Sequence, residues 1–498
     1  MRNVAAACLL CAPTALAFFS GGYFAEPRLI AAIVIWSLVL AMALIGVVPL
    51  PRSRPGWLML VGLIALTAWS ALSIAWAPLG GPAIENVQRL VLYIGVLMLA
   101  LAALRSRAAI RVMEPALAAG ATVVIGYGLA GRLLPGILEL DRSRSADGRL
   151  EQPITYWNAE GALAAVGLVL CAHLAADHTR SVRVRALAGA AAVPLGAGVY
   201  LSFSRGAIAV GALGLLALVA LAPTRAQLHA SAVALASGTV AAVLTGVVPA
   251  VASLEGSVSD RARAGALVLV ALVGLALGAA LFTARRARLE LRGAASAGAL
   301  PWASRLRPLA AVAVAAVAIG LVVGGVGERP TEDELAAGAE FGRLTSVSSS
   351  RYEYWRVGLD AFERRPLAGV GSGGFRVEWL RERRIPEPVK DTHSLEIEIA
   401  SELGLVGLLA LAMMIAGVVG SGRRALRREP GVTAGWCAAL LVWFLHASID
   451  WDWQLPAVTL PAIVLAGALI ALAEAAPTAA AEAPRTPRSP AELSGRES

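Results

Sequence analysis

Residues 341–407 read FGRLTSVSSSRYEYWRVGLDAFERRPLAGVGSGGFRVEWLRERRIPEPVKDTHSLEIEIASELGLVG, and they form the main long polar passage in a chain otherwise built from apolar runs. Arginine, glycine and acidic residues are dense in this stretch, and its end leads into another apolar run. Polar residues that interrupt an apolar pattern are costly in a bilayer and tend to mark functional sites, as do loops held by a rigid scaffold. We therefore expect the chemistry of the protein here.

Apolar segments make up most of the remaining chain. Of 498 residues, 58% are hydrophobic, and the mean hydropathy is +0.70. Segments of about 18 or more apolar residues can cross a hydrocarbon core of roughly 30 Å. The sequence thus predicts an all-α, polytopic membrane protein with about 12–14 transmembrane helices and excludes a soluble enzyme. The apolar segments fall at 4–22, 29–50, 57–77, 84–104, 115–135, 159–177, 184–202, 206–222, 228–252, 264–284, 309–327, 395–419, 434–450 and 456–474.

The formal net charge of +9 comes mainly from arginines in the short connections between these segments. They fall in every second connection, as expected for cytoplasmic loops, so the charge requires no nucleic-acid partner. We predict an inner or plasma membrane protein with both termini in the cytoplasm and residues 328–394 on the extracytoplasmic side. The arginines of this pattern are Arg52, Arg54, Arg105, Arg107, Arg111, Arg180, Arg183, Arg185, Arg225, Arg285, Arg286, Arg288, Arg292, Arg305, Arg307, Arg423, Arg424, Arg427 and Arg428.

The predicted organisation has four parts. Residues 1–327 hold eleven apolar segments, 328–394 form one long extracytoplasmic loop, 395–474 hold the C-terminal transmembrane helices, and 475–498 form a disordered cytoplasmic tail rich in Ala, Pro, Glu and Arg. The first segment could be a cleavable signal peptide, although we expect a retained helix. The four cysteines lie within apolar runs and indicate no metal site or disulfide framework.

Two shorter polar stretches are predicted on the same side as the long loop. Asn158 and Glu160 open a helix after a Tyr-Trp pair, either as a cap with interfacial aromatic residues or as a polar lip of the active cavity. Arg205 lies in a turn between two apolar runs, on the side where positive charge is disfavoured. An arginine there needs an anionic partner, and a phosphate group suits its planar guanidinium.

A third polar cluster follows near the C-terminus. His446 and Asp450 are four residues apart, which would place them on one face of a helix. An aromatic belt with a capping aspartate and a functional pair remain equally open.

Within the central stretch, the spacing predicts an amphipathic helix that begins near Arg351 and is ended by Pro366. Trp355, Leu359 and Phe362 are expected to pack rather than to bind a ligand. The arginines of this region, Arg343 and Arg351, are either solvated or, together with Arg205, form a site for a diphosphate.

GVGSGG at 369–374 formally matches a dinucleotide-binding fingerprint. We reject that interpretation, because no strand precedes it and it lies outside the cell. A turn in which the backbone approaches a lipid head group or another helix fits better.

His393 is predicted to open the next helix, and helical spacing would put Glu396 on its face and Glu402 on the opposite one. Glu396 could then orient the imidazole, while Glu402 would bind another helix or a loop backbone. A histidine with a pKa near neutrality suits a general base that activates a sugar hydroxyl. Such a base beside a cationic site implies a lipid substrate with an anionic head, and this chemistry requires no metal ion or cofactor.

The chain resembles the O-antigen ligase and O-antigen polymerase superfamily of bacterial envelope glycan enzymes. The resemblance covers roughly 155–420 and rests on YWNAEGALAA, on SFSRGA, and on the central block, in which GR…SSSRYEYWRVGLDAF, RPLAGVGSGGF and HSLEIEIASELGLVG follow in the family's order. It implies a membrane glycosyltransferase of the GT-C type that moves a glycan from an undecaprenyl-diphosphate-linked donor in the membrane lipid to a glycan, lipid or protein acceptor.

Carried onto this chain, the resemblance implies roles for individual residues. Arg205 and Arg351 would bind the diphosphate, with Arg343 as a weaker candidate. His393 would activate the acceptor hydroxyl, and Glu402 matches the family's acidic position.

The chain departs from the family at Ser394, where the family often has Asn, and this leaves the acceptor open. Two other classes also remain open. A transporter or flippase of lipid-linked saccharides would use arginines along its pathway, but its charges usually lie near the midplane. A non-catalytic scaffold of an envelope assembly complex would be indifferent to loss of His393.

Overall fold

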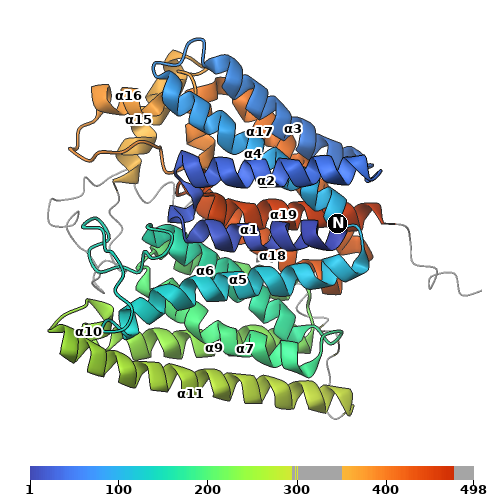
Figure 1. The fold of residues 1–498 in the computed structure, drawn as a ribbon, viewed down its shortest axis with the longest axis vertical. Helices are drawn as coiled ribbons and strands as arrows, with labels where there is room; N and C mark the ends of the chain where they lie inside the picture. Colours follow the sequence, from blue (N-terminus) through green and yellow to red (C-terminus); the bar gives the residue numbers. More distant parts are fainter. Residues whose placement is uncertain (294–297, 299, 301–349, 476–498) are drawn as a thin grey trace, which may run out of the picture.

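The computed structural model describes residues 1–293, 298, 300 and 350–475, and these parts are helical with connecting turns (Figure 1). The helices are α1 (Arg2–Ala17), η1 (Ser20–Gly22), α2 (Ala25–Leu44), α3 (Arg54–Ser73), α4 (Gly80–Ala103), α5 (Arg107–Leu133), α6 (Trp157–Ala176), α7 (Val182–Leu201), α8 (Arg205–Leu221), α9 (Arg225–Gly246), α10 (Pro249–Ala252), α11 (Val258–Leu291), α15 (Arg351–Arg364), α16 (Phe375–Glu382), α17 (Leu395–Arg428), α18 (Pro430–Ala447), η3 (Asp452–Gln454) and α19 (Pro456–Glu474).

Among the described residues, 11 helices are long and apolar enough to cross a membrane. Two shorter apolar helices, α1 and α8, also coincide with predicted segments. Each predicted segment overlaps a helix except 309–327, which lies outside the described residues. The prediction of a polytopic helical membrane protein is therefore confirmed. The predicted tail lies almost wholly outside the described residues, and the domain boundaries stay predictions.

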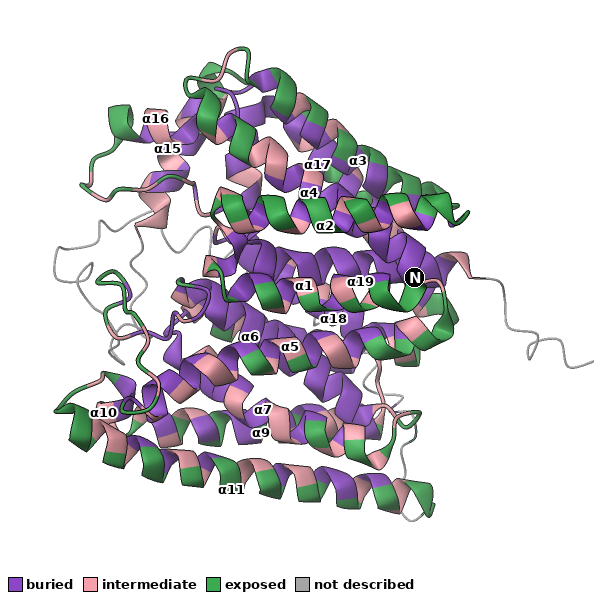
Figure 2. Cartoon of the chain, viewed as in Figure 1, coloured by how far each residue is buried: buried purple, intermediate pink, exposed green. Residues whose placement is uncertain are grey.

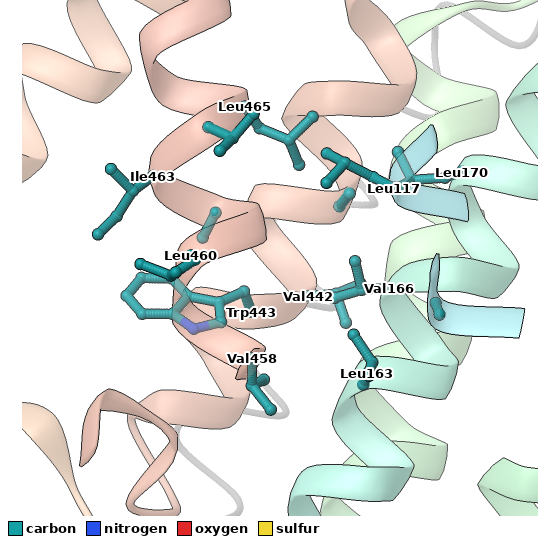
Figure 3. Packing of buried hydrophobic residues seen from close by; sticks show 14 of the residues in the cluster. Leu117, Leu163, Val166, Leu170, Val442, Trp443, Val458, Leu460, Ile463 and Leu465 are labelled. Atoms are coloured by element: carbon teal, nitrogen blue, oxygen red, sulfur yellow. The ribbon is translucent and has the colours of Figure 1, made fainter. Parts of the chain in front are cut away.

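Helices α6 and α19 form the centre of the bundle. The apolar window of each is 100% buried, and both are coloured as buried along their length in Figure 2. Figure 3 shows Val442 of α18 beside Leu163 and Val166 of α6, with Trp443 against Leu460 of α19. Lipid tails are as apolar as these side chains, so close packing rather than removal from water holds such helices together. The packed centre is a rigid support for the loops at its ends.

Helix α17 is interrupted at Gly404. This glycine has φ 64° and ψ −159°, a conformation that residues with a side chain rarely adopt. The interruption frees backbone groups that the polar passage satisfies: the Val370 N–H donates to the Ser401 carbonyl (2.9 Å), and the Leu405 N–H donates to the Pro366 carbonyl (2.8 Å). The turn that follows α15 is thereby fixed to α17.

The arginine-rich connections meet at one end of the bundle. Arg107 at the start of α5 pairs with Glu429 between α17 and α18 (2.8 Å), and Arg185 of α7 pairs with Glu290 near the end of α11 (2.6 Å). Helices α15 and α16 lie at the opposite end, as Figure 1 shows. The fold thus separates the arginine-rich connections from the polar passage, as the alternating charge pattern predicts.

Candidate functional site

An ion pair between Arg351 and Asp450 lies at the centre of the polar end. Arg351 is the first residue of α15, and its guanidinium donates to Asp450, which follows the end of α18. The Asp450 side chain is fully buried, whereas that of Arg351 is 24% exposed. The Tyr156 hydroxyl donates to Asp450 Oδ1 (2.7 Å), and Asn158 Nδ2 donates to the Tyr156 oxygen (2.7 Å). Asn158 therefore belongs to a buried network that connects α6 with α15.

The electrostatics of this network favour a charged Asp450 and a neutral Tyr156. Burial alone would raise the pKa of the Asp450 carboxyl, but Arg351 and His393 outweigh burial and hold that pKa below its usual range. Burial and the neighbouring Asp450 carboxylate raise the pKa of the Tyr156 phenol well above its usual range. The phenol thus keeps its proton and serves as a donor to a carboxylate.

Arg205 begins α8 and lies close to the start of α15. The preceding Phe203 has φ 48°, a conformation uncommon outside glycine, and Ser204 caps the helix. Arg205 is partly exposed, and the charges of both Arg205 and Arg351 act on the Tyr352 phenol. Arg205 and Arg351 are 146 residues apart in the sequence. The structure therefore brings them to one region, around Tyr352. Arg343, the third predicted arginine, lies outside the described residues.

His393 lies beside this region in a conformation that the helical prediction misses. It has φ 55°, and α17 begins only after Ser394, which caps it. The His393 Nδ1 is 3.1 Å from the Asp391 carbonyl oxygen. Its ring centroid lies 5.1 Å from that of Tyr354 and 6.2 Å from that of Trp451. A left-handed residue held by its own loop costs about 1–3 kcal/mol and often marks a functional position.

The predicted relation between His393 and Glu396 is wrong, because His393 is not part of the helix and helical spacing does not apply to it. The Glu396 carboxylate accepts hydrogen bonds from Ser448 Oγ (2.8 Å) and Ser394 Oγ (3.3 Å). Glu396 thus ties the start of α17 to the end of α18, and Asp391 provides the contact to Nδ1 through its backbone.

Burial lowers the pKa of the His393 imidazole below its usual value, because the charged ring is poorly solvated there. The Asp450 carboxylate opposes this effect by stabilising the imidazolium, and Arg351 adds to it by repulsion. The ring is consequently neutral at neutral pH, with a lone pair available to accept a proton.

With His393 as the general base that the resemblance implies, this environment predicts the pH dependence of glycan transfer. Only neutral His393 can accept a proton, so we expect kcat/KM to rise with pH through a midpoint below the ordinary histidine value of about 6.5 and to level off by neutrality. Initial rates of transfer measured from about pH 4.5 to 8 would give this midpoint. An acid limb centred at pH 7 or above would contradict the assignment.

Glu402 lies against a loop backbone, one of its two expected partners. Its carboxylate accepts the N–H groups of Gly373 (2.7 Å) and Phe375 (3.2 Å). The GVGSGG turn approaches other backbone as expected: a Cβ at Gly369 would lie 2.3 Å from the Glu402 carbonyl, and one at Gly371 would lie 2.4 Å from the Ala77 Cα. The role of Glu402 visible here is to hold the turn that leads into α16.

We expect Glu402→Ala to lower the free energy of unfolding by about 2–4 kcal/mol, because two hydrogen bonds to a buried carboxylate are lost. Glu402→Gln keeps one acceptor oxygen and should lose about half as much. Thermal unfolding in detergent would measure both variants. Equal melting temperatures for wild type and Glu402→Ala would rule out this role.

Two further expectations need correction. Helix α18 ends at Ala447, so Asp450 lies beyond it and does not share a helical face with His446. His446 Nδ1 instead lies 2.5 Å from Asp452 Oδ2. In α15, Trp355 packs as predicted, but Leu359 is 46% exposed because the buried stripe is centred on another face of the helix.

Sequence reasoning also left functional candidates unassigned. The sequence suggests Asp450 only as a helix cap or as a partner of His446, whereas in the structure it is the carboxylate that Arg351 and Tyr156 share. Tyr354, which lies next to the His393 ring, donates its hydroxyl to Glu387. An Asp beside Trp451 and Trp453 was the available signal for Asp450, but its partners are distant in the chain.

The arrangement combines two guanidinium groups with a neutral imidazole at one end of a helical membrane protein. Guanidinium groups bind phosphate oxygens through paired hydrogen bonds, and a neutral imidazole can remove a proton from a hydroxyl. The described residues contain no group of three or more metal-ligating side chains.

Residues 258–412 match the family model described as O-antigen ligase. The match confirms the resemblance to the O-antigen ligase and polymerase superfamily and covers α11, α15, α16 and the first half of α17, including His393 and Arg351. No curated protein matches the chain.

Proposed function

We propose, from the O-antigen ligase domain matched at 258–412, that this membrane protein is a glycosyltransferase of cell-envelope polysaccharide synthesis. It transfers a glycan from an undecaprenyl-diphosphate-linked donor to an acceptor hydroxyl. One observation carries the proposal: the Asp450 carboxylate pairs with Arg351 and acts electrostatically on His393. A phosphate-binding group and a proton acceptor therefore adjoin each other.

Arg351 and Arg205 would bind the donor diphosphate. Arg351 keeps 24% of its side chain exposed, and Arg205 at the start of α8 is also partly exposed. Both can reach a ligand from their present positions. Positive charge held in a partly buried site stabilises the developing charge of a leaving diphosphate more strongly than it would in water.

His393 would act as the general base. Nδ1 faces the Asp391 carbonyl (3.1 Å), which favours the tautomer with the proton on Nδ1 and leaves Nε2 to accept one. As the acceptor oxygen bonds to the anomeric carbon, its proton moves to Nε2. The bond between the anomeric carbon and the phosphate oxygen breaks, and its electron pair leaves with the lipid diphosphate, beside the two arginines.

The orientation of the protein follows the charge pattern. The arginine-rich end would face the cytoplasm together with both termini, and the end with His393 would face the extracytoplasmic side. The donor lipid would reach Arg351 from the outer leaflet.

Product formation tests the proposal directly. Purified protein in lipid vesicles is supplied with an undecaprenyl-diphosphate oligosaccharide, first alone and then with candidate acceptors. Longer glycans with released lipid diphosphate would indicate a polymerase, and product only with an added acceptor would indicate a ligase. Movement of labelled donor across the vesicle membrane without any glycan transfer would instead show a transporter. If neither transfer nor movement occurs, the protein is a non-catalytic scaffold.

A further inference from the structure

A second group of polar and aromatic side chains adjoins His393, and it comes from elements that do not hold the arginines of the donor site. The group, here called the acceptor cluster, consists of Tyr23, Arg89, Arg376, Lys390 and Asp391. Tyr23 lies between η1 and α2, Arg89 on α4 and Arg376 on α16. In Figure 1, α2, α4 and α16 lie above α1 and α19, whereas α6 lies below them.

Charges of both signs converge at Asp391. The charges of Arg376, Arg89 and Lys390 act on its carboxylate, as does His393. The Tyr23 phenol has Asp391, Arg376 and Arg89 as its charged neighbours as well. The cluster therefore offers both hydrogen-bond donors and an acceptor at one place.

Two guanidinium groups of the cluster have unused hydrogen-bonding capacity in the described part of the protein. Arg89 is only 4% exposed, and its Nη2 donates to Asn86 Oδ1 (2.9 Å), but its buried Nε has no partner there. The buried Nε of Arg376 has none either. Buried N–H groups without a protein partner are available to a bound ligand.

Aromatic rings connect the cluster to the proposed base. The Tyr23 ring centroid lies 5.5 Å from that of Trp451, and the Trp451 centroid lies 6.2 Å from that of His393. Lys390 Nζ lies 5.8 Å from the Tyr23 ring centroid. All four side chains are at least partly exposed, so a ligand can reach the rings from solvent.

We propose that the acceptor cluster binds the acceptor as a saccharide and presents its hydroxyl to His393. Sugar hydroxyls both donate and accept hydrogen bonds, which suits a carboxylate among guanidinium groups, and the apolar faces of sugar rings pack on aromatic rings. This inference rests on the proposed function. It adds that the acceptor approaches from the α2, α4 and α16 side, and that it is a glycan rather than a protein side chain.

Acceptor kinetics test the proposal. Transfer rates are measured at fixed undecaprenyl-diphosphate oligosaccharide while the concentration of the oligosaccharide freed from the same lipid is varied as acceptor. We expect Arg376→Gln and Lys390→Gln each to raise the acceptor KM about tenfold, with the donor KM unchanged. Arg381→Gln, on the exposed face of the same helix α16, is the matched control and should behave as wild type.

Two outcomes would overturn the inference: an unchanged acceptor KM in both variants, or a change in the donor KM instead. Tyr23→Phe removes only one hydroxyl and provides a milder variant if Arg376→Gln fails to fold. Saturation-transfer NMR with the freed oligosaccharide gives a readout that does not depend on catalysis. Signal that is lost in Arg376→Gln but kept in Arg381→Gln supports the site even if transfer is never seen, whereas equal signals contradict it.

Discussion

We expect His393→Ala to lower the rate of glycan transfer by about 10²–10⁴-fold, the usual contribution of a positioned general base. The acceptor hydroxyl would then have to lose its proton to water in a partly buried site. The lowered pKa of His393, caused mainly by burial, keeps the wild-type ring neutral and ready to accept that proton. Under the proposed function the arginines bind the donor diphosphate, so the Kd for undecaprenyl-diphosphate oligosaccharide should change little.

His229→Ala is the matched control for this experiment. His229 lies exposed on α9 near the arginine-rich end, where its Nδ1 contacts the Arg225 carbonyl (2.6 Å). His229→Ala should transfer glycan at the wild-type rate. Both variants should melt at the wild-type temperature, because neither side chain fills the apolar core. Full activity of a folded His393→Ala protein would remove His393 from the mechanism.

Arg351→Ala is expected to have the second large effect, because it should lower both the stability of the protein and its affinity for the donor. Its loss strands the fully buried Asp450 carboxylate, and a buried charge that loses its partner destabilises a protein by about 3–5 kcal/mol. Removing the guanidinium also removes a proposed phosphate-binding group, so donor affinity should fall by at least about tenfold, since hydrogen bonds to charged groups contribute roughly 1.5–3 kcal/mol each. Thermal unfolding and donor titration measure the two effects separately.

A double variant separates these roles. In Arg351→Ala/Asp450→Asn, the amide oxygen can still accept the Tyr156 hydroxyl, and the stranded charge is gone. We expect most of the thermal stability to return while donor affinity stays low. Arg356→Ala is the matched control, because Arg356 on the same helix pairs with Glu353 (2.7 Å) and Asp360 (2.8 Å) near the surface. Recovery of donor binding in the double variant would show that Arg351 acts only on stability.

Several features of the site could be predicted because they break a local pattern. Arg205 interrupts two apolar runs, and the turn that it occupies is short enough to be located from the sequence. Arg351 begins a helix whose end at Pro366 was foreseen, and α15 has those bounds within a residue or two. Glu402 was expected to bind a helix or a loop backbone, and it accepts two N–H groups of the glycine-rich turn.

Other features depend on conformations that no periodicity reveals. His393 was placed on a helical face, but its φ of 55° puts it in the preceding turn, so the inferred partnership with Glu396 failed. His446 was paired with Asp450 by the same reasoning, whereas the helix ends between them and His446 contacts Asp452. Spacing rules hold only inside a helix, and functional residues in membrane proteins often lie just past its end.

The sequence by itself therefore determined that the protein lies in a bilayer and how apolar and polar segments alternate along the chain. It contains apolar segments long enough to span a bilayer, one long polar passage, and arginines gathered at one end. Segment length and charge bias are local properties, since each segment must satisfy its own backbone and cover its own apolar surface in lipid. Only the tertiary structure decided that Asp450 joins Arg351, 99 residues away, beside His393. That contact depends on how α15 and α18 pack, and packing is a property of the whole bundle rather than of any one segment.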